Sequence, residues 1–111
     1  MIRLSVMYPA SPGTTFDWDY YLTPHLALAR KLLSPFGLLR IEIDRGLGGF
    51  PPGTPPPFHA VGHLFFSTVA ELERAMAAAA PDLIADQGKY FSGESIVQIN
   101  EVVEPVLCEE T

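Results

Sequence analysis

The sequence predicts an α+β sandwich of the ferredoxin-like type, with the element order βαββαβ and one four-stranded antiparallel sheet. Two observations lead to this fold class: four segments alternate their side chains with a period of two, as strands do, and two segments carry apolar side chains at helical spacing. With 111 residues, the chain is long enough for one hydrophobic core and too short for two. We therefore expect a single domain over residues 1–111.

The first predicted strand covers residues 2–8, where apolar side chains from Ile2 to Tyr8 occupy every second position. A connection over residues 9–15 follows, and its prolines and glycine are typical of turns. It leads to the first helix, expected from Phe16 to about Leu33. Asp17 or Thr15 is suited to cap the first turn, because a side-chain oxygen there accepts from a free backbone amide.

The first helix opens on a segment rich in aromatic and acidic side chains that ends in Pro24 and His25. Proline suits a first-turn position, so we expect the helix to begin in two steps. Tyr21 and His25 are four residues apart and fall on one helix face, with Leu28 and Leu32 continuing the stripe. A phenol and an imidazole would then share the rim of an apolar surface, which makes this segment the first candidate for a site.

A half-exposed second strand is expected over residues 38–45, where Leu39, Ile41 and Ile43 alternate with charged side chains. Residues 46–57 contain four glycines and five prolines. Proline lacks the amide donor and glycine loses much entropy when ordered, so this run is neither a helix nor a central strand. It is either a flexible linker or a lid over a pocket.

The third strand is predicted over residues 58–66, and its two faces differ. Small side chains at Ala60 and Gly62 indicate a face to which helices approach closely. His59 and His63 then fall on the opposite face. Four residues along a strand place these two imidazoles about 13 Å apart, too far to share one metal ion.

The second helix begins after Ser67 or Thr68, since Thr68 and Glu71 have the spacing of a capping box. Its buried stripe runs from Val69 to Ala79. Pro81 suits the first turn of a helix, so we expect a separate short helical turn from Pro81 to about Asp86. The two helical pieces would complete the covering of one sheet face.

Residues 88–93 read as a loop with exposed aromatic side chains at Tyr90 and Phe91. The fourth strand is expected over residues 94–103, where Val97 and Ile99 alternate with other side chains, and Pro105 ends it. This strand completes the sheet of the predicted fold.

With both helices on one face of the sheet, the other face is left bare. Its side chains are too apolar for water and too polar for a dry core, so we expect a homodimer that encloses a cavity between the two sheets. The residues assigned to this face are Arg3, Ser5, Met7, His59, Val61, His63, Phe65, Ile96 and Gln98.

Charge and cysteine content exclude several classes of partner. Seven basic and thirteen acidic residues give a net charge of -6, without a cluster of lysines or arginines. Nucleic acid and membranes are therefore not expected as partners. A single cysteine, Cys108, allows neither an internal disulfide nor a thiolate metal cluster, and the N-terminus does not have the pattern of a signal peptide. We expect a cytoplasmic protein.

Five segments together resemble the EthD family, named for a protein of ethyl tert-butyl ether degradation, and the resemblance covers nearly the whole chain. They are the opening MIRLSVMYP, the segment FDxDYYxxxH, the turn Arg45-Gly46-Leu47, the motif HLxF from His63, and VQIxEVV from Val97. The Asp-Tyr-Tyr-x-x-x-His element is fairly specific. Family members often read His-x-Pro-Leu after the two tyrosines, whereas here Pro24 precedes His25.

The resemblance implies a dimeric α/β barrel and a place in catabolism or secondary metabolism, without a known reaction. Some relatives are treated as accessory factors of a haem monooxygenase system, and fungal relatives are implicated in dehydration or decarboxylation of polyketides. Three functions therefore stay open: cofactor-independent proton transfer on a small molecule, a non-catalytic carrier or accessory role for an oxygenase, and a cofactor-free monooxygenase.

The candidate catalytic residues are His25, Tyr21 and Tyr20, because an imidazole titrates near neutral pH and a neighbouring phenol orients it. We expect the ligand to be small and apolar or aromatic, in a cavity whose floor includes Ser5, His63 and Gln98. No metal and no cofactor is expected. The candidate ligand-binding residues are Trp18, Ser5, Met7, His63, Phe65 and Gln98.

Overall fold

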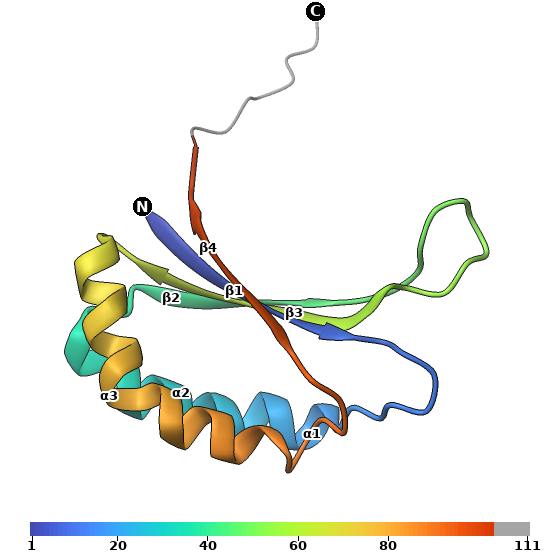
Figure 1. The fold of residues 1–111 in the computed structure, drawn as a ribbon, viewed down its shortest axis with the longest axis horizontal. Coiled ribbons are helices and arrows are strands. Elements are labelled where there is room, and N and C mark those ends of the chain that lie inside the picture. The colour runs from blue at the N-terminus through green and yellow to red at the C-terminus, as the bar shows by residue number, and fades with distance from the viewer. Residues whose placement is uncertain (104–111) are drawn as a thin grey trace, which may run out of the picture.

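The computed structural model describes residues 1–103 of the chain (Figure 1). The predicted end of the last strand at Pro105 and the single Cys108 lie outside the described residues. Two short helical segments are not α-helical: η1 is a π-helix and η2 is a 3-10 turn. The elements are β1 (Ile2–Pro9), α1 (Trp18–Tyr20), η1 (Tyr21–His25), α2 (Leu26–Leu33), η2 (Ser34–Phe36), β2 (Arg40–Arg45), β3 (Phe58–Phe66), α3 (Val69–Gln87) and β4 (Ile96–Glu101).

The strands form one antiparallel sheet in the order β2-β3-β1-β4. Helices α2 and α3 cover one face, and the other face is open (Figure 1). The predicted α+β ferredoxin-like fold is therefore confirmed. The third strand has the predicted bounds, whereas the second and fourth are shorter than expected and begin at Arg40 and Ile96.

The first helix begins in steps, as expected, but through a π-helical turn. Asp17 accepts a hydrogen bond from the Tyr20 amide at 3.1 Å and so caps α1. Pro24 lacks an amide hydrogen, and the chain widens around it, with the Leu26 amide donating to the Tyr21 carbonyl oxygen five residues earlier. The wider turn keeps the helix continuous through the proline.

The buried stripe of this helix differs from the prediction by one position. Its buried side chains are Tyr21, His25, Ala29 and Leu33, at a strict spacing of four, in place of Leu28 and Leu32 beyond His25. An α-helix would rotate such a stripe gradually around its axis, but the π-helical turn over Tyr21–His25 adds a residue and brings Tyr21 into line with the buried side chains of α2.

The hydrophobic core lies between the sheet and the two helices. Its fully buried side chains include Leu33 from α2, Phe66 from β3 and Leu72 from α3. A second cluster at the other end of the sheet is aromatic, and Tyr8, Tyr21 and Tyr90 belong to it. The fold therefore has an aliphatic end and an aromatic end, and the candidate histidine lies at the aromatic end.

Two features after β3 correct the sequence interpretation. Helix α3 runs without a break from Val69 to Gln87 with Pro81 inside it, so there is no separate helical turn after residue 80. Tyr90 and Phe91 are 4% and 3% exposed, although the sequence indicated exposed loop aromatics. They are buried because Phe91 bridges to Phe16 and the Tyr90 carbonyl accepts from the Asp17 amide at 2.7 Å.

Residues 46–57 form an arm that continues the β2-β3 hairpin away from the sheet and the helices (Figure 1). Hydrogen bonds order its tip: the Gly49 amide donates to the Thr54 carbonyl at 2.9 Å, and Thr54 Oγ1 donates to the Pro51 carbonyl at 2.8 Å. Within residues 1–103, no helix has the length and apolar character needed to cross a bilayer.

Candidate functional site

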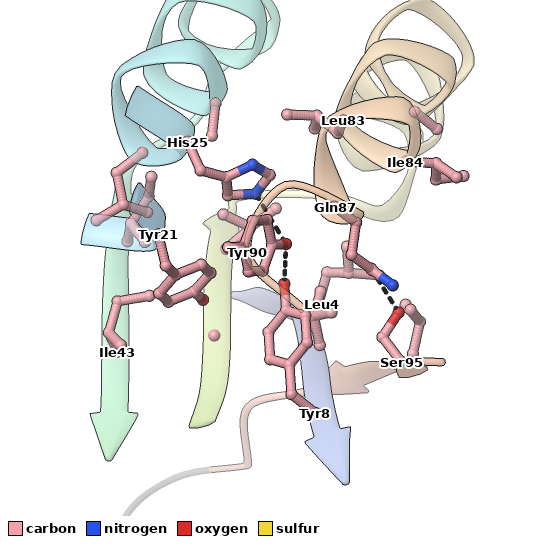
Figure 2. Close-up of a pocket in the computed structure, with 18 of the residues that line it drawn as sticks. Leu4, Tyr8, Tyr21, His25, Ile43, Leu83, Ile84, Gln87, Tyr90 and Ser95 are labelled. Carbon is pink, nitrogen blue, oxygen red and sulfur yellow. Dashed lines mark hydrogen bonds between the residues drawn. The ribbon is translucent and has the colours of Figure 1, made fainter. Parts of the chain in front are cut away.

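A cavity of about 230 Å³ lies between the helices and the sheet at the aromatic end of the core. Its walls are almost entirely apolar, with Leu4 and Val6 from β1, Ala29 from α2 and Leu83 from α3 among them. Four aromatic or imidazole groups close one end: Tyr8, Tyr21, His25 and Tyr90 (Figure 2). The cavity is thus a mainly apolar chamber with two polar groups in its wall: these four side chains, and Gln87 with Ser95, whose hydroxyl donates to the Gln87 Oε1 at 2.9 Å (Figure 2).

His25 is held by a buried carboxylate that the sequence did not indicate. Its Nδ1 lies 2.9 Å from Oδ2 of Asp86, and each of the two side chains is 10% exposed. Asp86 also accepts from the Tyr20 hydroxyl at 2.8 Å, and Nζ of Lys89 lies 3.6 Å away. These partners come from η1, α1 and the turn after α3, so Asp86 links α3 to the helical segments that carry Tyr20 and His25.

Asp86 is ionised at neutral pH. Burial acts to raise the pKa of its carboxyl, but the hydrogen bonds from His25 and Tyr20 and the charge of Lys89 lower it overall. An ionised carboxylate only accepts hydrogen bonds, so the His25 Nδ1 carries the proton that it receives. In the neutral ring, Nε2 then has a free electron pair and is the basic atom of the site.

The Nε2 atom of His25 faces two phenols in series (Figure 2). The Tyr90 hydroxyl lies 3.3 Å from it and 2.7 Å from the Tyr8 hydroxyl. Burial raises the pKa of both phenols well above the usual range, so both remain neutral donors at physiological pH. The result is one hydrogen-bonded chain from Asp86 through His25 and Tyr90 to Tyr8.

Tyr21 fixes the orientation of the His25 ring. The two rings stack with their centroids 5.6 Å apart and an interplanar angle of 17°. The Tyr21 hydroxyl reaches β3 at Gly62, where an added Cβ would lie 2.5 Å from the phenol oxygen. Gly62 is therefore needed for space, and the spacing of four between Tyr21 and His25 produced the predicted pairing.

The other predicted ligand-binding residues lie on the opposite side of the sheet. The His63 Nδ1 is 2.9 Å from the Ser5 hydroxyl, and its Nε2 is 2.9 Å from Oδ2 of Asp44. Asn100 donates to the Ser5 hydroxyl at 3.1 Å and accepts from the Gln98 amide at 2.7 Å. This open-face network crosses all four strands, with no contact to the cavity beside His25.

The expected cavity with a floor of Ser5, His63 and Gln98 under His25 is therefore corrected. Successive residues of a strand point to opposite faces, so Leu4 and Val6 line the cavity whereas Ser5 and Met7 point away from it. The sheet itself separates the two groups of candidates. His25 and Tyr21 belong together, and the predicted open-face residues form a different surface.

Three remaining candidates flank these two groups. Phe65 is 2% exposed although it lies on the open face, because the Arg40 guanidinium covers its ring at 4.0 Å. Trp18 stacks under the Arg45 guanidinium at 4.2 Å beside the aromatic cluster and does not line the cavity. Tyr20 contacts the site through its hydrogen bond to Asp86 and by stacking on the Tyr90 ring, with the centroids 6.3 Å apart.

Sequence reasoning missed Asp86, Tyr90 and Tyr8. Asp86 and Tyr90 lie more than 60 residues from His25 along the chain, and the contacts are set by how α3 returns to the sheet. One signal was available: Tyr8 ends the first strand on the helix-facing side, so its hydroxyl had to find a buried partner. Among residues 1–103, no three histidine, cysteine or acidic side chains gather as a metal site would require.

Solved structures of similar fold include EthD-like proteins. An EthD-like protein from Ralstonia eutropha JMP134 is 28% identical, with 93% of this chain and 92% of that chain covered and a TM-score of 0.85. An ethyl tert-butyl ether degradation family protein from Bacillus halodurans C-125 is 22% identical, with 93% and 99% covered and a TM-score of 0.72. The resemblance to the EthD family is thereby confirmed.

A dimeric ferredoxin-like protein from an uncultured marine organism shares the fold, with 13% identity, 97% and 100% covered, and a TM-score of 0.52. No protein-family model and no curated protein sequence matches the chain.

Proposed function

We propose that this chain, an EthD-like protein of the dimeric α/β-barrel superfamily, binds a small apolar or aromatic molecule beside His25 and transfers a proton on it without a cofactor. The observation that carries the proposal is the hydrogen-bonded chain from Asp86 through His25 and Tyr90 to Tyr8, which ends in a mainly apolar cavity. Perturbed titratable groups that converge in a cleft are typical of catalytic sites.

The proposed chemistry follows from the roles of these atoms. A ligand that displaces the long 3.3 Å contact presents a C–H or O–H to the His25 Nε2, which accepts the proton. Asp86 stabilises the imidazolium that forms, and the neutral Tyr90 phenol donates to the oxygen on which negative charge develops. Return of the proton to another atom of the same ligand completes an isomerisation, a dehydration or a cyclisation.

The homodimer is proposed from the open face of the sheet. Phe65 and Ser5 are buried there by neighbouring side chains of the same chain, while Ile96 remains 53% exposed in the isolated chain. A second copy would cover this face. A protein of similar fold is described as a dimeric ferredoxin-like protein, which supports a dimer. Residues Ser5, His63 and Gln98 would then serve the subunit interface in place of the ligand.

A non-catalytic carrier that delivers its ligand to an oxygenase is the second candidate. The apolar lining of the cavity would serve a carrier equally well, since apolar walls bind and release a small molecule without chemistry. The base at Nε2, held by a buried carboxylate, is the feature that a carrier would not need. The two functions therefore differ in what His25 contributes after binding.

Proton exchange on a small aromatic ketone separates the two candidates. The probe is 1-tetralone in deuterated buffer, with loss of the proton next to the carbonyl followed by NMR. We expect exchange to be accelerated by the protein and reduced about 100-fold or more in His25→Gln. His63→Gln, on the open face, is the matched control: a His63→Gln protein that light scattering shows to be dimeric should exchange as the parent does. Bound 1-tetralone that exchanges no faster than in buffer would refute the catalytic function and favour the carrier.

A further inference from the structure

The arm formed by residues 46–57 ends in two exposed apolar side chains. Leu47 and Phe50 are each 91% exposed, the highest values among the large hydrophobic side chains of the described residues. The arm is ordered by its own hydrogen bonds, so this exposure belongs to a formed hairpin. Water is an unfavourable environment for such a tip, which indicates that another surface covers it.

The cavity beside His25 has an apolar rim that is also uncovered. Of its lining residues, Ile84 on α3 and Val97 on β4 are 70% and 54% exposed. These two residues define the mouth of the cavity, between α3 and the edge strand β4. No residue of the arm lines the cavity of its own chain, so the arm does not act as a lid in cis.

The strand directions relate the mouth of one subunit to the arm of another. Strand β1 is antiparallel to β3 and β4, and β2 is antiparallel to β3, so the edge strands β2 and β4 run in opposite directions. If two open faces meet about a two-fold axis parallel to the strands, β2 of one copy lies antiparallel beside β4 of the other. The edges of both sheets are then paired.

This arrangement brings the arm to the mouth. Strand β2 ends at Arg45 at the same end of the sheet at which β4 begins at Ile96. The arm of the partner subunit therefore emerges beside residues 88–95, next to the mouth. Twelve residues folded as a hairpin reach up to about 20 Å, enough to cross from β4 to α3.

A two-fold axis across the strands is the alternative, and it is less favourable. It pairs each edge strand with its own copy, so Glu42 at the centre of β2 would face Glu42 or Asp44 of the partner subunit. Like charges opposite each other destabilise a strand pair. With that axis, the arm of each subunit would also lie at the opposite end of the partner's sheet from the cavity mouth. The apolar tip of the arm and the cavity mouth would then both remain exposed to water.

We infer that the arm of each subunit covers the cavity mouth of the other, with Leu47 and Phe50 packed against Ile84 and Val97 of the partner subunit. The second copy thus completes a binding site that is open in the single chain. The inference rests on the homodimer of the proposed function. It adds that the two cavities depend on the arms, so a ligand leaves one subunit when the arm of the other moves away.

Cross-linking between marked chains tests the contact. In a Cys108→Ser background, a tagged Phe50→Cys chain is co-expressed with an untagged Ile84→Cys chain, and the dimer is treated with a short bismaleimide. Val69→Cys replaces Ile84→Cys in the control, since Val69 is also exposed on α3 but lies at its other end. We expect at least tenfold more tagged–untagged product with Ile84→Cys.

Light scattering before cross-linking separates the possible failures. A monomer would overturn both the homodimer and this inference. A dimer that cross-links through Val69→Cys, or equally through both positions, would overturn the inference and leave the homodimer intact.

Release of a fluorescent phenol measures the effect of the arm on the site. The probe is 1-naphthol, and its dissociation rate is followed by stopped flow. The variant Leu47→Ser/Phe50→Ser should remain dimeric and release 1-naphthol about tenfold faster, because the apolar cover is lost. Leu39→Ser removes an equally apolar, 51% exposed side chain away from the arm and should leave the rate unchanged. An unchanged rate in the arm variant would contradict a cover over the mouth.

Discussion

The two faces of the sheet carry the same chemical pair in two environments. On the helix-covered face, the His25 Nδ1 lies 2.9 Å from Asp86, and both side chains are 10% exposed. On the open face, the His63 Nε2 lies 2.9 Å from Asp44, but the Asp44 side chain is 66% exposed. The distances are equal, so the difference between the pairs lies in burial and in what the second ring nitrogen faces.

The second nitrogen decides what each pair is suited to do. That of His25 faces a phenol at the wall of an apolar cavity, whereas that of His63 bonds to the Ser5 hydroxyl inside a network across the sheet. Water screens an exposed carboxylate, and a buried one acts at low dielectric. We therefore propose the His25–Asp86 pair as the functional one, because it is buried and its free nitrogen lies at a cavity.

Removing each carboxylate should give the largest contrast between the faces. Asp86→Asn should lower the free energy of unfolding by about 1–3 kcal/mol, because it weakens buried hydrogen bonds to His25 and Tyr20. Asp44→Asn should lower it by less than about 1 kcal/mol, as for exposed pairs. Urea unfolding of both variants measures the difference, and equal losses would remove the distinction drawn between the faces.

The Asp86 contribution should also depend on pH. The folded-state pKa of Asp86 is below its ordinary value, so the stabilisation is present above the unfolded pKa of about 4 and is lost as the pH falls through the folded value. The stability deficit of Asp86→Asn should accordingly shrink in acid. A deficit that is constant with pH would show that the carboxylate charge is not what the site uses.

Filling the space beside the Tyr21 hydroxyl should disturb the cavity side alone. Gly62→Ala places a Cβ 2.5 Å from that oxygen and should cost about 1–3 kcal/mol through overpacking, with a shift of the Tyr21 ring from His25. Gly88→Ala is the control, since nothing lies within 4 Å of its added Cβ. Thermal unfolding compares the two, and a Gly62→Ala protein as stable as Gly88→Ala would contradict the close packing.

Alkaline pH should destabilise the protein through the buried tyrosines of the helix-covered face. Burial raises the pKa of Tyr8, Tyr21 and Tyr90 in the folded state, so their stabilisation is fully present below the unfolded value of about 10 and declines above it. In Tyr8→Phe, the free energy of unfolding should therefore decrease less steeply with pH above about 10 than it does in the parent protein. Ser5→Ala on the open face should leave the slope unchanged, and an equal effect of both substitutions on the slope would argue against the buried phenols as its source.

The smallest effect is expected on the open face. Gln98 is exposed in the single chain and donates only to Asn100, so Gln98→Ala should change the free energy of unfolding of the subunit by less than about 0.5 kcal/mol. The affinity of the Gln98→Ala protein for 1-naphthol, measured by fluorescence titration, should match that of the parent protein. A weakened affinity would return Gln98 to the ligand site and blur the division between the faces.

The fold was predictable because it depends on local patterns. Alternation located the third strand over residues 58–66 without error, and Thr68 correctly marked the start of α3. The pairing of Tyr21 with His25 also followed from spacing, since a helix brings residues four apart together. These features need only neighbours in the sequence.

The rest of the site depends on contacts that local patterns do not contain. Asp86 reads as a helix-end charge and Tyr90 as a loop aromatic, and only the return of the chain to β4 brings them to His25. The π-helical turn at Pro24 shifted the buried stripe by one position, which an ideal helical period does not anticipate. The cavity beside His25 lies between the helices and the sheet, whereas the sequence suggested that Ser5, His63 and Gln98 form its floor.

NMR of the imidazole nitrogens tests the central claim most directly, namely that the cavity beside His25 is the ligand site. The chain has three histidines, so a 15N-histidine-labelled protein gives three assignable rings. Addition of 1-naphthol should shift the Nε2 resonance of His25 and leave those of His63 unchanged. A shift confined to His63, with His25 unaffected, would place the ligand on the open face and contradict the account.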